Sequence, residues 1–133
     1  ERQLSLLAEE KIEAAGKQDV FSFYDEKNEL RLSIKGTNLL YLESADNYVC
    51  VWYLNKGVLT KFMLRNTLKA IEESLENTNV LRCHRSFMVN FDQVKMIRRE
   101  KDGAYIDFGI EGVSDIPISR TYSEKVTSWF ITH

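Results

Sequence analysis

The sequence has few of the features that would place it among membrane, secreted or low-complexity proteins. Its 133 residues include one proline, and 11% are aromatic, which excludes a proline-rich linker and a disordered tail. No apolar run approaches the roughly 18 residues that a transmembrane helix needs, and the charged N-terminus does not fit a signal peptide. With 44% hydrophobic and 29% charged residues, the chain is expected to form one globular domain in the cytoplasm.

Cysteine and histidine are scarce as well, which limits the metal and catalytic sites that the chain could build. Cys50 and Cys83 lie in apolar, strand-like segments, so we expect reduced thiols. Zinc needs three or four ligands, yet the sequence has no C-x-x-C or H-x-x-x-H pair. No glycine-rich loop follows a strand in the form that cradles phosphates. The sequence therefore predicts no metal, no cofactor and no enzyme.

One segment, RCHRSFMVN (residues 82–90), nevertheless combines a thiol, an imidazole and two guanidinium groups. Cys83 and His84 are adjacent, but neighbouring side chains on a strand point to opposite faces, so the pair cannot act as nucleophile and base. We interpret Cys83 as a buried thiol and His84 as a half-buried, hydrogen-bonded imidazole. Arg85 and Ser86 remain as candidates for binding a polyanion.

Charge is distributed unevenly along the chain. The net charge is −2 and the pI is about 5.8, which argues mildly against a polyanionic partner. Residues 80–101, however, contain six Lys and Arg residues against two acidic ones. This local basic segment indicates a surface for a negatively charged partner.

Apolar periodicity predicts a chain dominated by β-hairpins. Stretches of alternating apolar and polar residues recur with turn-forming residues between them. They predict a hairpin around residues 25–29, a three-stranded meander over residues 39–64, and a hairpin around the turn Lys101-Asp102-Gly103. We expect these strands to make up most of the fold.

Three segments switch to the helical period of 3.6 residues. Residues 2–14 predict a helix that links this domain to another part of the protein. An apolar stripe that begins at Leu68 predicts a short internal helix. Near the C-terminus, residues 121–124 (TYSE) have the form of a capping box. The last helix is therefore expected to start near Thr121, with Arg120 just outside its N-terminus.

Polar groups that suit a polyanion recur where the predicted strands end. Asn47 lies in one turn, Arg85 in another, and Arg120 precedes the last helix. Arginine can meet guanine or a phosphate with two hydrogen bonds, and asparagine offers both a donor and an acceptor. Each residue also has a purely structural interpretation, because asparagine suits tight turns and arginine suits solvated surfaces. Periodicity alone leaves open whether these loops converge on one edge.

Four stretches of the sequence match the motifs of one bacterial family, in the order that the family has. They are LLYLESADNYVCVWYL, FMLRNTLKAIEESL, VLRCHRSFMVNFDQVKMI and DIPISRTYSEKV. Over about residues 36–127, the chain thus resembles the LytTR-type DNA-binding domains of bacterial transcription regulators. The resemblance implies a mainly β fold of antiparallel stacked sheets, a LytTR-like β-sandwich with a short internal helix and a C-terminal helix. It also implies binding to double-stranded DNA through loops.

The resemblance implies positions for the DNA contacts as well. The family's base-reading positions fall on Asn47, Arg85 and Arg120, where arginine suits guanine in the major groove and asparagine suits adenine or a phosphate. Other groups would then hold the DNA backbone and set the register without reading sequence. These backbone contacts are expected from Lys61, Arg65, Ser86, Tyr122 and Lys125. The N–H groups at the start of the last helix would add a site for a phosphate. The acidic pI is low for a DNA-binding domain.

The family further implies a place in a longer protein. We expect residues 1–18 to be a helical linker and residues 19–133 to be the DNA-binding output domain of a transcriptional regulator. The first residue is Glu1 rather than methionine, which agrees with an upstream receiver or sensor region. A membrane-anchored sensor region would tether the domain to the inner membrane. The family also implies a dimer on paired sites and no small-molecule substrate.

A function of another class stays open at this point. A β-rich module that binds a protein or senses a ligand could present the same basic segment to an acidic partner. Such a module would show no preference among duplex sequences at physiological salt. Binding to random duplexes at a stated salt concentration separates the two hypotheses.

Overall fold

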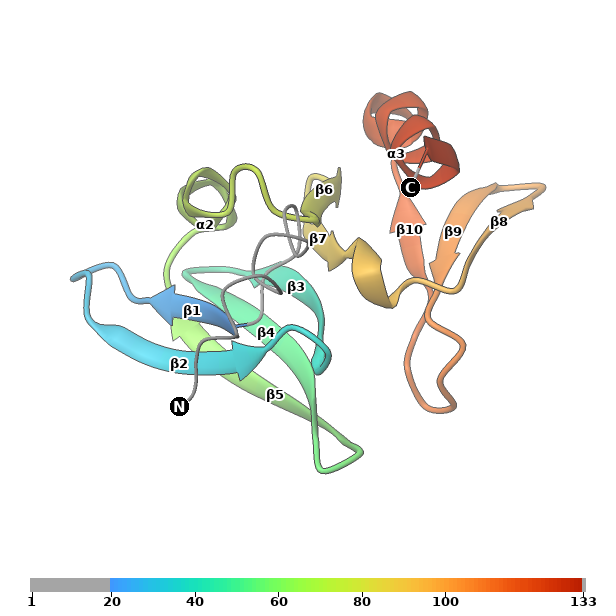
Figure 1. The fold of residues 1–133 in the computed structure, drawn as a ribbon. Coiled ribbons are helices and arrows are strands. Elements are labelled where there is room, and N and C mark those ends of the chain that lie inside the picture. Colours follow the sequence, from blue (N-terminus) through green and yellow to red (C-terminus); the bar gives the residue numbers. More distant parts are fainter. Residues whose placement is uncertain (1–19, 133) are drawn as a thin grey trace, which may run out of the picture.

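Strands are the main elements of the computed structural model, which describes residues 20–132 (Figure 1). Every strand pairing within these residues is antiparallel. The elements follow one another in the order β1 (Val20–Tyr24), β2 (Leu30–Lys35), β3 (Leu39–Ala45), β4 (Tyr48–Asn55), β5 (Val58–Arg65), α2 (Leu68–Ser74), β6 (Val80–His84), β7 (Phe87–Asn90), the 3-10 helix η1 (Phe91–Gln93), β8 (Met96–Glu100), β9 (Gly103–Asp107), β10 (Ile116–Ile118) and α3 (Arg120–Thr132).

The strands form three sheets in the described part of the chain, with the orders β1-β2, β5-β4-β3-β7-β6 and β10-β9-β8. The first is the hairpin predicted around residues 25–29, and the third contains the hairpin predicted around the turn at residues 101–103. The predicted meander is β3–β5, and β7 extends it by pairing with the free side of β3. The mainly β, antiparallel fold class that the sequence predicted is confirmed.

The five-stranded sheet forms the middle layer because its strands carry apolar side chains on both faces. Figure 1 shows the β1–β2 hairpin (blue) beside β3–β5, and the β8–β10 sheet with α3 (orange and red) on the other side of β6 and β7. The core toward β1, β2 and α2 contains Phe21, Phe23, Ile34, Leu39, Leu42, Val49, Val51, Leu64, Leu68, Ile71, Leu75, Val80 and Met88. The core toward β8–β10 and α3 contains Leu40, Tyr41, Cys83, Val89, Phe91, Val94, Ala104, Ile106, Phe108, Ile116, Ile118 and Val126.

Helix α2 forms where the sequence predicts it, and Thr67 is its N-cap. The Thr67 hydroxyl accepts a hydrogen bond from the amide of Ala70 at 3.2 Å, which satisfies one of the free N–H groups of the first turn. Leu68, Ile71 and Leu75 are all buried, so the predicted apolar stripe packs on the sheet. This packing fixes the helix beside β6 and β7.

Helix α3 starts one residue earlier than the sequence predicts. It spans Arg120–Thr132, so Arg120 belongs to its first turn and does not stand outside it. The reason is that Ser119 follows β10 directly and its carbonyl oxygen already accepts a hydrogen bond from the amide of Tyr122 at 3.1 Å. The helical turn therefore closes around Arg120. The expected start near Thr121 is correct to within one residue, but the expectation that Arg120 stands outside the helix is wrong.

The linking helix predicted over residues 2–14 lies outside the described residues. The boundary predicted between residues 18 and 19 therefore stays a prediction. Among residues 20–132, the helices are all too short or too polar to cross a membrane.

Candidate nucleic-acid interface

The β3–β4 turn presents Asn47 at one end of the five-stranded sheet. Two residues, Asp46 and Asn47, connect Ala45 to Tyr48, which are paired across the two strands. Asp46 has a φ of 59°, a left-handed conformation that Asp and Asn tolerate better than most residues. Asn47 is exposed. The turn thus holds the Asn47 amide group in solvent at this end of the sheet.

The β6–β7 turn presents Arg85 and Ser86. Its backbone is fixed by His84, whose Nδ1 accepts a hydrogen bond from the amide of Ser86 at 3.1 Å. The His84 ring also packs edge-on against Phe87, with 5.6 Å between the ring centroids. The expected hydrogen-bonded, half-buried role of His84 is therefore confirmed. Arg85 itself is exposed.

Two backbone hydrogen bonds link the turns that carry Asn47, Arg85 and Arg120. The amide of Ser44, near the end of β3, donates to the carbonyl oxygen of Ser86 at 2.9 Å. The amide of Ser119 donates to the carbonyl oxygen of Cys83 at 3.0 Å, and Arg120 follows Ser119 directly. The β3–β4 turn, the β6–β7 turn and the start of α3 consequently lie side by side, so the convergence that the sequence left open is present.

Arg85 and Arg120 have free guanidinium groups, unlike the four ion-paired arginines Arg31, Arg65, Arg82 and Arg98. Within residues 20–132, neither side chain makes an ion pair or a side-chain hydrogen bond, and both are exposed. An exposed and unpaired guanidinium keeps all five of its donors for a ligand. The linked turns therefore present an arginine pair suited to phosphate or guanine.

Arg65 ends β5 at the same end of the sheet as the β3–β4 turn, because it pairs with Tyr48, the residue after that turn. Its Nε donates to the Glu26 carboxylate at 2.8 Å, and its Nη1 donates to the Tyr48 hydroxyl at 3.4 Å. These hydrogen bonds, first that to Tyr48 and then that to Glu26, raise the pKa of Arg65. Arg65 thus keeps its positive charge, and Glu26 already occupies its Nε donor.

The remaining expected backbone contacts are placed less uniformly. Lys61 lies four residues before Arg65 on β5, about 13 Å along the strand, with its ammonium group 5.5 Å from the Trp52 ring centroid. Ser86 lies in the turn with Arg85. Tyr122 is half-buried against the core under α3, and Lys125 is exposed on α3. Ser86 and Tyr122 thus lie at the linked turns, whereas Lys61 lies away from them.

The basic segment of residues 80–101 is less basic in the fold than in the sequence. Arg98 pairs with Glu100, Asp107 and Asp115, and Arg82 pairs with Glu72. Glu100 lies inside the segment, whereas Glu72, Asp107 and Asp115 come from elsewhere in the chain. The surface that the basic segment indicates for a negatively charged partner therefore does not include these two arginines.

Cys83 belongs to the core and not to a reactive site. Its side chain is fully buried, and its Sγ lies 3.7 Å from the carbonyl oxygen of Pro117. Burial raises the pKa of the Cys83 thiol to about 12, so the thiol stays protonated at neutral pH. Cys50 is also a free, buried thiol, and burial raises its pKa as well. The interpretation of Cys83 as a buried thiol is confirmed.

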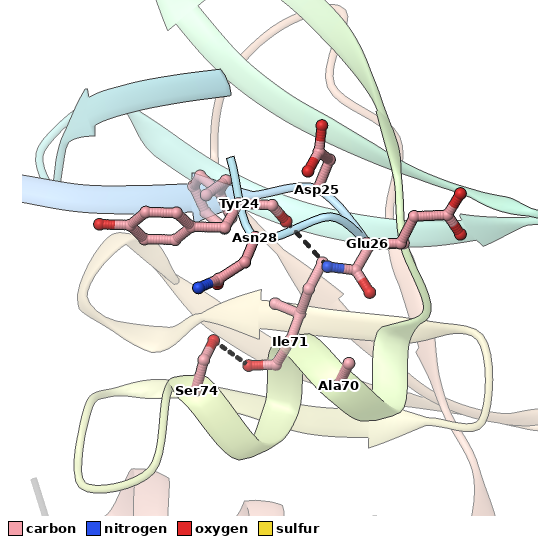
Figure 2. A pocket seen from close by; sticks show the side chains of 9 residues that line it. Tyr24, Asp25, Glu26, Asn28, Ala70, Ile71 and Ser74 are labelled. Atoms are coloured by element: carbon pink, nitrogen blue, oxygen red, sulfur yellow. Dashed lines mark hydrogen bonds between the residues drawn. The ribbon is translucent and has the colours of Figure 1, made fainter. Parts of the chain in front are cut away.

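A hollow between the β1–β2 turn and α2 is the kind of feature that a ligand-sensing module would need (Figure 2). Its volume is about 250 Å³, below the roughly 300–1,000 Å³ of typical small-molecule sites. Its polar wall is already bonded internally. The Ser74 hydroxyl donates to the Ile71 carbonyl oxygen at 2.8 Å (Figure 2), and the Asn66 amide donates to the Tyr24 carbonyl oxygen at 2.8 Å. This hollow does not support the ligand-sensing alternative.

Metal binding finds no geometric support in residues 20–132. No three or more His, Cys, Asp and Glu side chains in this part of the chain come together in a group that could hold an ion. The hollow near α2 offers carboxylates from Asp25 and Glu26, but these side chains are bonded to neighbouring groups.

The scaffold and the linked turns together define a β-rich domain that offers arginine and asparagine side chains from loops, a surface suited to nucleic acid. Comparison with protein families makes the class specific. The family model described as the LytTr DNA-binding domain matches residues 19–131. This chain belongs to the LytTr DNA-binding domain family, which is a family of DNA-binding domains and not a class of enzymes.

Individual relatives agree with this family. The chain is 32% identical over 89 residues to the sensory transduction protein LytT of Bacillus subtilis (strain 168), covering 67% of this chain and 35% of that protein. It is 29% identical to the protein of the same name from Bacillus anthracis, covering 67% of this chain and 34% of that protein. The chain thus spans about a third of the length of these curated relatives.

A solved LytTr DNA-binding domain from Bacillus cereus has the same fold. The two structures superpose with a TM-score of 0.62, at 20% sequence identity, over 84% of this chain and 95% of the other. At this identity, the likeness establishes the fold alone.

Proposed function

We propose that this domain reads DNA sequence in the major groove with loops, as the output domain of a bacterial transcriptional regulator. Asn47, Arg85 and Arg120 contact base edges from three neighbouring turns. The observation that carries the proposal is the pair of backbone hydrogen bonds, from Ser44 to Ser86 and from Ser119 to Cys83, that link these turns. The free guanidinium groups of Arg85 and Arg120 support it further, because a bidentate contact to guanine needs both arms of the fork.

Backbone contacts flank the three base-reading residues in this proposal. Arg65, Ser86 and Tyr122 are close to the linked turns and hold phosphates there. Lys125 and Lys61 hold phosphates farther away, one from α3 and the other from β5. Such contacts set the register of the protein on the duplex and provide the salt-dependent part of the affinity. The domain has no catalytic role in this proposal.

The proposal also places the domain in a larger cytoplasmic protein. Residues 1–18 are the linker, residues 19–133 are the DNA-binding domain, and an upstream receiver or sensor region passes on the signal. The name of the Bacillus relatives, sensory transduction protein, supports this arrangement. The match to this chain covers only about a third of the length of these relatives, which supports it as well. In the full-length protein, two domains bind paired sites as a dimer. A membrane-anchored upstream region would tether the domain to the inner membrane.

Selection of duplexes from a random-sequence library tests the proposal directly. The 133-residue chain is incubated with the library at 150 mM salt, bound duplexes are recovered, and the enriched sequence is compared with random duplex in gel shifts. We expect one enriched motif and binding that weakens steeply as salt rises. If no sequence is enriched and all duplexes bind alike, the domain does not read sequence. The protein-interaction alternative then becomes the better description.

A further inference from the structure

Arg82 lies three residues before Arg85 in the sequence, but its side chain points into the protein. Only 15% of it is exposed, and its Nη1 donates to Oε1 of Glu72 on α2 at 2.6 Å. Its Nε donates to the carbonyl oxygen of His84 at 3.1 Å, and its Nη2 donates to the carbonyl oxygen of Arg85 at 2.6 Å. One guanidinium group therefore joins α2 to two consecutive carbonyls of the β6–β7 turn.

These bonds fall where the strand ladder itself is interrupted. The register between β6 and β7 shifts between Arg82 and His84, as at a β-bulge. A bulge leaves backbone groups without their ladder partners and redirects the side chains that follow. The donors of Arg82 satisfy the carbonyls of His84 and Arg85 at this point. The turn is thus held by a side chain in addition to the sheet.

Only arginine has the geometry for this arrangement. Its planar fork carries five N–H donors, so that one group can bind a carboxylate and two carbonyls at once. Lysine carries a point charge on a flexible stem and cannot reproduce all three bonds with the same geometry. Glu72 supplies the opposite charge that keeps the guanidinium beside the turn, because its carboxylate is the ion-pair partner of Arg82.

We infer that Arg82, anchored by Glu72, is a positioning residue for DNA reading, which fixes the β6–β7 turn so that Arg85 meets its base in one orientation. The inference rests on the proposed function, in which Arg85 contacts a base edge. A bidentate contact depends on the direction of the guanidinium, and a turn ordered before binding avoids the entropic cost of ordering it on the DNA. Arg82 acts through Arg85 and does not touch the duplex.

A pair of charge-matched variants separates positioning from simple electrostatics. Glu72→Gln and Glu73→Gln each remove one negative charge from neighbouring positions on α2, but only Glu72 binds Arg82. Electrostatics alone would strengthen binding to any duplex in both variants. We expect Glu72→Gln to lower the ratio of affinities for selected and random duplex, whereas Glu73→Gln leaves that ratio unchanged.

A double-mutant cycle tests whether Arg82 acts through Arg85. In the parent chain, Arg82→Lys should lower the ratio of affinities for selected and random duplex by about tenfold, within the range of one bidentate base contact. In an Arg85→Ala background, the same substitution should change the ratio less than about twofold, because the contact that it positions is already gone. The melting temperature of each variant is measured to test whether the fold is retained. A purely structural role of Arg82 would lower the melting temperature and leave the ratio unchanged.

The outcomes distinguish this inference from the proposed function. If Arg85→Ala itself leaves the ratio unchanged, the base-reading role of Arg85 fails, and with it the function on which the inference rests. If Arg85→Ala lowers the ratio but Arg82→Lys and Glu72→Gln do not, the inference alone is overturned. Equal effects of Arg82→Lys in both backgrounds overturn it as well. Should Arg82→Lys fail to fold, the comparison of Glu72→Gln with Glu73→Gln decides, since Glu72 is 39% exposed and tolerates the change.

Discussion

The backbone amide of Ser44 donates a hydrogen bond to the carbonyl oxygen of Ser86 at 2.9 Å. This bond continues the pairing of β3 with β7 beyond its last strand pair, Glu43 with Phe87. It therefore holds the β3–β4 turn next to the β6–β7 turn, although a helix and three strands separate them in the sequence. The neighbouring positions of these turns are the basis of the proposed DNA-reading surface.

Loss of the guanidinium groups of Arg85 and Arg120 should remove sequence preference. Arg85→Ala and Arg120→Ala are each expected to cost roughly 1–3 kcal/mol of binding to the selected duplex, with a much smaller effect on random duplex. Fluorescence anisotropy with both duplexes, at one fixed salt concentration, measures this difference. Lys35→Ala is the control, since it removes a positive charge at the end of β2, beside the opposite end of the five-stranded sheet. Unchanged preference in both arginine variants would show that these residues do not read bases.

Release of Arg65 from Glu26 should strengthen binding to every duplex. The carboxylate of Glu26 occupies Nε of Arg65 at 2.8 Å, and a phosphate has to compete with it. Glu26→Gln is therefore expected to raise the affinity for selected and random duplex by the same factor. Arg65→Ala should lower both affinities and reduce the slope of log affinity against log salt by about 1. Glu29→Gln changes the same charge in the same hairpin turn without a bond to Arg65, and an equal gain in that variant would contradict the prediction.

The amide of Asn90 should make a large contribution to stability. Asn90 is fully buried, and its Nδ2 donates to the carbonyl oxygens of Gly36 and Leu39 at 3.0 and 2.9 Å. Its Oδ1 accepts from the amide of Asp92 at 3.2 Å. Asn90→Ala removes these three hydrogen bonds from a buried site, so we expect a loss of roughly 2–4 kcal/mol of unfolding free energy. Urea denaturation measures it.

Asn55→Ala serves as the control for Asn90→Ala, because Asn55 is exposed at the end of β4. Its effect should stay within about 0.5 kcal/mol. A loss of similar size in both variants would mean that the buried hydrogen bonds of Asn90 are not the cause.

Burial of Cys83 should protect its thiol from alkylation. The thiolate is the reactive form, and burial raises the pKa of Cys83 from 9.0 to about 12. We expect iodoacetamide at pH 8 to label Cys83 far more slowly in the native chain than in guanidinium chloride, as followed by mass spectrometry. Rapid labelling of native Cys83 would show that β6 opens readily or that the thiol is accessible.

The raised pKa of Cys83 also makes the stability of the protein depend on pH in the alkaline range. Because the pKa of Cys83 is higher in the folded state than the 9.0 of the free thiol, the unfolded state releases its proton first. The stabilising contribution is complete below pH 9 and is lost as pH rises toward about 12. Melting temperatures of the parent and of Cys83→Ala, measured from pH 7 to pH 11, should therefore converge as pH rises. A constant difference over this range would contradict the shift.

Local sequence patterns were sufficient for the hairpins, the meander and α2. Alternation with period two and turn residues such as Asp46 act over a few neighbouring residues, so they can be read without knowing the fold. The start of α3 was misplaced by one residue, because Ser119 is held by β6 and the helix begins directly after it. Local capping patterns do not contain that contact.

The sequence alone could not show which arginines form ion pairs. Arg82, Arg85, Arg98 and Arg99 lie in one basic segment, but in the described part of the chain Arg82 and Arg98 are ion-paired, whereas Arg85 and Arg99 are left free. Glu72 comes from α2 to pair with Arg82, and Asp115 comes from the segment before β10 to pair with Arg98. Charge counts along the chain cannot identify such partners, since they depend on which segments meet in space.

The sequence by itself determined the strands, the turns and the family, because these depend on side-chain periodicity, backbone preference and motif order within short stretches. Only the tertiary structure decided which turns are neighbours and which cations remain free. The reason is that β3 pairs with β7, and β10 with its following residue Ser119 packs beside β6, through contacts between segments far apart in the chain. Those contacts bring the turns that carry Asn47, Arg85 and Arg120 side by side. The Arg82 side chain, bonded to Glu72, meets the carbonyl oxygens of the β6–β7 turn.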